Sequence, residues 1–92
     1  MQVLLGPEDG VTNFVMRRFV LDPGAATPHH THDWEHEVLI LEGEGVVVSA
    51  DDEHPVRPGN VVYVPPAEVH QFRNTGSGTF AMLCLVPMKG HA

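Results

Sequence analysis

Basic residues are scarce in this 92-residue chain. Five Lys and Arg stand against twelve Asp and Glu, which leaves a formal net charge of −7 at pH 7. Nucleic acids and anionic membrane surfaces are bound through basic protein faces, so we expect neither of them as a partner. The same acidity disfavours long-range attraction of a phosphorylated substrate.

Cysteine and long apolar runs are also nearly absent. Cys84 is the single cysteine, so an internal disulfide is excluded, as is usual in a reducing cytoplasm. The amino-terminal segment has neither the positive charge nor the apolar length of a signal peptide. No stretch approaches the roughly 20 apolar residues of a membrane span. We therefore expect a cytoplasmic protein that does not enter a membrane.

Helical periodicity is lacking as well. Short β-branched and apolar runs alternate instead with turns rich in Gly and Pro, a pattern typical of an all-β sandwich or barrel. The runs cover 3–5, 14–21, 38–41, 46–49, 60–64, 70–74 and 80–86. We expect residues 1–92 to form one domain with its core over 14–87, a solvated acidic loop at 51–53 and a disordered tail at 88–92. The first run either pairs with the edge of a partner subunit or frays.

Histidine is abundant in residues 24–43, GAATPHHTHDWEHEVLILEG. His30, His32 and His36 are all even-numbered, and in an extended chain such residues point to one face. Several neutral imidazole nitrogens directed at one point can bind a borderline transition metal. His29 has the opposite parity, so we expect it at the rim of the site or behind a ligand. The alternative is a polar loop that is rich in histidine without a metal.

The second half of the chain carries a matching pattern. The two halves read Gly24-x5-His30-x-His32-x3-His36-x6-Gly43 and Gly59-x5-Pro65-x-Ala67-x2-His70-x3-Asn74. Together they resemble the two motifs of the cupins, with His36 at the glutamate position and Ala67 at the second-motif glycine position. The resemblance spans residues 24–74 and implies a small β-barrel of the jelly-roll type, a double-stranded β-helix, that holds one metal. The ligands that it implies are His30, His32, His36 and His70.

Shorter strings narrow the resemblance. Small single-domain cupins with an all-histidine manganese site have similar strings. In this chain the strings are FVMR at 14, HTHDWEHE at 30, EVHQFRN at 68 and LCLVP at 83. That group implies a homodimer and a redox-capable metal with oxidative chemistry such as alkene cleavage. Manganese, one ion per chain, is therefore expected from the resemblance, with iron as the runner-up. Imidazole donors alone do not discriminate sharply among Mn, Fe, Co, Ni, Cu and Zn.

The ligand at position 36 has rivals in Glu35 and Glu37. Counting back from Gly43, six intervening residues lead to His36 and five lead to Glu37. We therefore assign His36 as a ligand and expect Glu37 behind the ligands. Four neutral donors leave the full +2 charge on the ion, which favours an anion, a hydroxide or an enolate-like oxygen as a further ligand.

Alternation along the strands also predicts the wall of a pocket. Met82 and Cys84 share one face of the last strand, and Phe72 shares the parity of His70, so we expect these side chains near the metal. Two residues are expected at the entrance of the pocket, Arg17 and Trp34. For each of them the alternative is ordinary core packing.

The expected function is that of a metal-dependent, dioxygenase-like oxidoreductase that acts on a small apolar or enol-type molecule. No catalytic residue beyond the metal ligands is indicated. One alternative is a non-catalytic module that binds a metal or a small ligand. A sugar isomerase or epimerase is less favoured, because the chain is acidic and has no lysine before Lys89.

Overall fold

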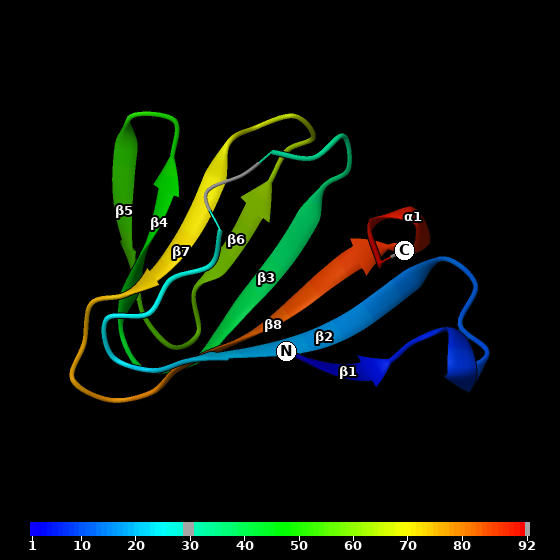
Figure 1. Cartoon of the computed structure of the whole chain (residues 1–92), viewed down its shortest axis with the longest axis horizontal. Helices are drawn as coiled ribbons and strands as arrows, with labels where there is room; N and C mark the ends of the chain where they lie inside the picture. The colour runs from blue at the N-terminus through cyan, green and yellow to red at the C-terminus, as the bar shows by residue number, and fades with distance from the viewer. Residues whose placement is uncertain (29–30, 92) are drawn as a thin grey trace.

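The computed structural model describes residues 1–28 and 31–91, which form two antiparallel sheets (Figure 1). The larger sheet has five strands in the order β1-β2-β8-β3-β6, and the smaller has three in the order β5-β4-β7. The strands are β1 (Gln2–Leu5), β2 (Phe14–Leu21), β3 (His36–Glu42), β4 (Gly45–Ser49), β5 (Asp52–Val56), β6 (Val61–Val64), β7 (His70–Asn74) and β8 (Phe80–Pro87). Two short helical segments are η1 (Pro7–Asp9) and α1 (Met88–His91). Neither these nor any other helix in the described ranges is long and apolar enough to cross a membrane.

The core lies between the two sheets. In β8 the even-numbered residues 80–86 are all at most 5% exposed, because alternate side chains of a strand point to the same face. Val47 of β4 and Phe72 of β7 join them from the smaller sheet in one buried cluster. This packing of two sheets confirms the all-β, jelly-roll-like architecture predicted from the strand spacing.

The turn between β3 and β4 requires a glycine. Gly43 has a φ of +80°, a left-handed conformation that residues with a Cβ rarely adopt. A Cβ at this position would also overlap the backbone carbonyl of Thr79. The chain entering β8 therefore runs directly against this turn, which fixes the end of β3 relative to β8.

The amino-terminal strand pairs within its own chain. β1 lies antiparallel to β2, with Gln2 opposite Arg18 and Val3 opposite Arg17. The two outcomes considered from the sequence, a frayed end and a strand paired with a partner subunit, are therefore not what the structure shows. This pairing covers the edge of β2 that would otherwise offer unpaired backbone groups.

Asp52 and Glu53 belong to a strand, which corrects the loop expected over 51–53, whereas Asp51 lies in a turn and all three residues are exposed. β5 pairs with β4 along its whole length, and Ala50 and Asp51 form the tight turn between them, with Ala50 at a φ of 50°. The sequence pattern does not reveal this hairpin, because the turn lacks the Asn-Gly or Asp-Gly pair that marks such turns. In addition, four of the five residues of β5 remain exposed, so no alternation is visible.

The tail is ordered as far as it is described, in contrast to the disorder expected for 88–92. The side chain of Met88 packs against the core, and Lys89 forms an exposed ion pair with Asp33 at 3.3 Å. Gly90 lies against the indole ring of Trp34. These contacts hold α1 beside the ends of β8 and β2 (Figure 1).

Candidate metal centre

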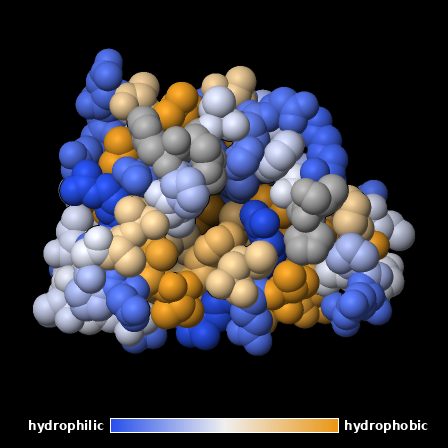
Figure 2. Space-filling view, viewed as in Figure 1, coloured by the Kyte–Doolittle hydropathy of each residue, from blue (hydrophilic) through white to orange (hydrophobic). Residues whose placement is uncertain are grey.

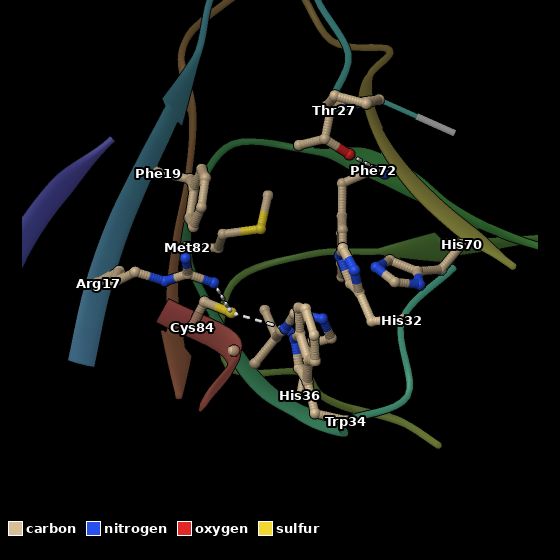
Figure 3. A pocket seen from close by; sticks show the side chains of 13 residues that line it. Arg17, Phe19, Thr27, His32, Trp34, His36, His70, Phe72, Met82 and Cys84 are labelled. Carbon is tan, nitrogen blue, oxygen red and sulfur yellow. Dashed lines mark hydrogen bonds between the residues drawn. The ribbon is translucent and has the colours of Figure 1, made fainter. Parts of the chain in front are cut away.

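Three histidine rings meet between the two sheets (Figure 3). His36 begins β3 of the larger sheet, His70 begins β7 of the smaller sheet, and His32 lies in the loop that leads into β3. One ligand nitrogen of each lies within 4.8 Å of the others, and the ring centroids are 5.0, 5.4 and 5.6 Å apart. The indole of Trp34 stacks on His32 with centroids 4.3 Å apart, which fixes the orientation of that imidazole.

Backbone contacts hold the His32 loop beside the start of β7. The amide of Ala67 donates a hydrogen bond to the carbonyl oxygen of His32. Ala67 has a φ of 66°, a left-handed conformation that suits glycine, which is the residue expected at this position of the second motif. At the other end of β7 the side-chain amide of Asn74 donates to the carbonyl oxygens of Leu21 and Gly78, at 2.9 and 2.8 Å.

The arrangement of the three rings suits one divalent transition-metal ion. Nitrogens bonded to one ion at about 2.1 Å are at most about 4.2 Å apart, so a small rotation of the rings brings all three to bonding distance. Nδ1 of His70 lies 3.0 Å from the carbonyl oxygen of Glu68. A carbonyl accepts hydrogen bonds only, so this contact places the proton on Nδ1 and leaves Nε2 for a metal. Nδ1 of His36 lies 3.4 Å from Sγ of Cys84.

Two residues predicted for the site, His29 and His30, lie outside the described residues, so the fourth ligand stays a prediction. Glu37 is not behind the ligands as expected. It is exposed on the face of β3 opposite to His36 and lines a groove on the outer surface. Strand alternation, which favours His36 as the ligand, also places Glu37 outside. Glu35 is exposed as well, and its carboxylate accepts a hydrogen bond from a surface tyrosine.

The histidines line a cavity of about 260 Å³. Its wall includes every pocket residue expected from the sequence, namely Arg17, Trp34, Phe72, Met82 and Cys84. The face drawn in Figure 2 is hollowed near its middle, and apolar residues gather below the hollow. The structure therefore brings these five side chains and the three described histidines to one place.

Several lining residues were missed by the sequence analysis, among them Phe19, Thr27 and Val38. Phe19 shares the parity of Arg17 and Val38 that of His36, so alternation could have found both. Thr27 lies outside the regular strands, where no periodicity applies. Its hydroxyl oxygen accepts a hydrogen bond from the backbone amide of Phe72 at 2.9 Å.

Burial and neighbouring positive charge act on the titratable groups of the cavity. Burial lowers the pKa of His32, and nearby His70 and Arg17 lower it further, so the neutral imidazole that binds metals is favoured. Burial raises the pKa of Cys84, and Arg17 offsets this only in part. The thiol is therefore neutral at pH 7. The cavity combines neutral donors, an apolar wall and one guanidinium.

Comparison with known proteins gives consistent matches. A family model described as "Cupin domain" matches residues 17–86. The oxalate-binding protein of Thermotoga maritima is 33% identical over 70 residues, which are 75% of this chain and 58% of that protein. The polyketide cyclase RemF from Streptomyces resistomycificus has a TM-score of 0.87 at 34% identity, over 94% of this chain and 62% of that one. A cupin 2 domain-containing protein from Halorhodospira halophila has a TM-score of 0.90 at 32% identity, over 95% of this chain and 62% of that one. The chain thus spans only 58% to 62% of the length of these proteins.

Proposed function

The chain belongs to the cupin family, and from that premise we propose that it is a metal-dependent enzyme for a small apolar molecule that carries an enol or ketone oxygen. The observation that carries the proposal is the convergence of His32, His36 and His70 at the wall of an apolar cavity of about 260 Å³. This volume lies just below the roughly 300–1,000 Å³ that is usual for ligand pockets. A small ligand is therefore favoured.

A bound divalent metal supplies Lewis acidity, which polarises a carbonyl or enol oxygen and stabilises negative charge on it. We propose manganese, with iron second, on the strength of the motif resemblance, and His30 as the fourth ligand. The hydrogen-bond distance between His70 and the carbonyl of Glu68 supports a fixed ring that presents Nε2. Phe72 and Met82 would keep water away from the reacting oxygen.

Two reactions suit such a site. Oxidation of an electron-rich enol or alkene by dioxygen, as a dioxygenase-like oxidoreductase performs it, is the first, because a redox-capable ion and an apolar wall suit it. A redox-neutral cyclisation is the second, and the likeness to the polyketide cyclase RemF favours it. In that reaction an enolate carbon attacks a carbonyl of the same molecule, and dioxygen takes no part.

Product mass and oxygen uptake separate the two reactions. Protein loaded with Mn(II) or Fe(II) is incubated with 1,3-diketones, flavonoid-like enols and styrenes as candidates for oxidation, and with 1,5-diketones, whose enolate carbon can close a six-membered ring on the second carbonyl. Oxidation consumes dioxygen and adds oxygen atoms to the products. Cyclisation proceeds without dioxygen and gives a product of equal mass, or of that mass less one water.

Two histidine variants provide the controls. His70→Ala removes a proposed ligand and should abolish turnover. His54→Ala alters an exposed histidine of β5 and should leave turnover unchanged. If protein shown to hold its metal turns over none of these compounds, the enzyme proposal is wrong.

A non-catalytic module that binds a metal or a small ligand is the alternative, and the likeness to an oxalate-binding protein favours it. Saturable binding of metal and oxalate without turnover would support this reading. A sugar isomerase or epimerase is disfavoured, since the chain has no lysine before Lys89. We place the protein in the cytoplasm, where the free thiol of Cys84 stays reduced.

A further inference from the structure

Arg17 points into the cavity, whereas its neighbour Arg18 lies on the other face of the sheet. The two residues follow one another in β2, so their side chains leave the strand in opposite directions. Nη2 of Arg17 lies 3.8 Å from Sγ of Cys84, and Cζ lies 5.3 Å from the centre of the Phe19 ring. Figure 3 shows the guanidinium directed toward Cys84, on the same side of the cavity as Phe19 and Met82.

The guanidinium of Arg17 has no anionic partner among the described residues. Its Nε is buried and has no hydrogen-bond partner in that part of the chain. Its two contacts there are the Cys84 sulfur and the Phe19 ring, and neither is a carboxylate. The described lining of the cavity includes neither Asp nor Glu.

A partly buried cation beside apolar walls is unfavourable unless an anion pairs with it. The chain as a whole has a net charge of −7, yet the cavity presents positive charge alone. Sγ of Cys84 contacts both Nη2 of Arg17, at 3.8 Å, and Nδ1 of His36, at 3.4 Å. The guanidinium and the histidine cluster are thus separated by one side chain, a gap that a small ligand with two neighbouring oxygen groups can span.

We propose that Arg17 binds an anionic oxygen of the ligand, so that the cavity selects small molecules with a carboxylate or enolate next to their ketone or enol group. The contact of this ligand with the metal depends on the proposed function. Its contact with Arg17 does not, because the guanidinium attracts the anion in metal-free protein as well.

Trp34 makes the proposal testable by direct binding. It is the single tryptophan of the chain and lines the cavity, so its fluorescence reports occupancy. Metal-free and Mn(II)-loaded protein are titrated with 4-methyl-2-oxopentanoate and with its methyl ester, which lacks the carboxylate charge. Arg17→Met keeps the length of the side chain and removes its charge. Arg57→Met removes the same charge from an exposed turn and is the matched control.

Arg17→Met should weaken binding of the acid by about 10- to 100-fold, as expected for the loss of a charged hydrogen-bonding partner. Binding of the ester, and of both probes to Arg57→Met, should not change. The proposal is overturned if Arg17→Met, folded by circular dichroism, binds the acid like the native protein. It is also overturned if native protein binds acid and ester equally or binds neither. Arg17-dependent acid binding in a protein that takes up no metal would contradict the proposed function alone.

Discussion

At the scale of single residues, protonation of His32 couples the site to pH. Burial, His70 and Arg17 lower the pKa of His32 in the folded protein below its ordinary value of 6.5. Below that pH the unfolded chain therefore takes up this proton more readily than the folded chain, so stability is lost as the pH falls through 6.5 toward the folded pKa. Metal-free native protein should lose more unfolding free energy between pH 7.5 and pH 5.5 than His32→Gln does. Urea unfolding at both pH values measures this, and equal losses would contradict the assignment.

A second residue, Ala67, is held in an unfavourable conformation. Its φ of 66° costs a residue with a Cβ roughly 1–2 kcal/mol. Replacement by Gly removes this cost but makes the unfolded chain more flexible, which offsets part of the gain in stability. We expect Ala67→Gly to raise the free energy of unfolding by about 0.5–1 kcal/mol, measured by urea unfolding. Ala25→Gly, at a position outside the residues of positive φ, is the control and should lower it. A lower stability for Ala67→Gly would show that its contacts outweigh the strain.

Alternation explains why much of the cavity wall was predictable from the sequence. Arg17, Phe72 and Met82 lie inside strands, where parity fixes the face once one member of the strand is known. The same rule places Glu37 on the outer face. The expectation that Glu37 lies behind the ligands relied instead on its place next to His36 in the sequence. Thr27 was missed because it reaches the cavity from an irregular segment, and no periodicity governs such a position.

At the scale of elements, the β3–β4 turn limits what the chain tolerates. Gly43→Ala should lower the free energy of unfolding by more than the roughly 1–2 kcal/mol of a left-handed alanine, because its Cβ would also overlap the Thr79 carbonyl. Gly59→Ala is the matched control. Gly59 has a φ of +91° with no atom within 4 Å of an added Cβ. Its substitution therefore measures the cost of the left-handed backbone conformation alone, without a steric overlap. Thermal unfolding of both variants measures the difference, and equal losses would exclude a role for the close approach.

Strands with apolar alternation or long apolar runs were predictable, and elements stabilised by tertiary contacts were not. β3 and β8 follow the expected runs because each buries one face or both, and β2 is half-buried along most of its length. β5 is an exposed edge strand held by pairing with β4, and its charged sequence resembles that of a loop. α1 has four residues, too few for helical periodicity to show, and it is fixed by packing of Met88 and by the contact of Gly90 with Trp34.

At the scale of the whole molecule, a bound metal should add appreciably to a thin core. A ligand present at 100 times its dissociation constant stabilises the folded state by about 2.7 kcal/mol. For a domain of this size that corresponds to a rise in Tm of about 10–20 °C. Scanning calorimetry with Mn(II), and again after addition of a chelator, measures the shift. His70→Ala should show little of it, and an unchanged Tm in native protein would contradict a metal site that is formed on folding.

The fold class of the whole chain could be predicted because turn residues punctuate it at regular intervals. The ligand of the cavity could not be predicted in this way. Which oxygen-bearing molecule enters the cavity depends on the position of Arg17 relative to the histidine cluster. That position is a relation between β2 and two distant segments, and no local sequence pattern contains it. The groove on the outer surface likewise emerges only when β2, β8, β3 and β6 are placed side by side.

In β8, Met82 and Cys84 line the cavity, while Leu83 and Leu85 line the groove on the outer surface. Single substitutions there alter one surface at a time. Insertion or deletion of one residue would instead exchange the two sets, turning the leucines inward and the cavity residues outward. We therefore expect natural variants of this chain to differ in the composition of β8 but to keep its length, and any engineering of this strand should conserve its residue count.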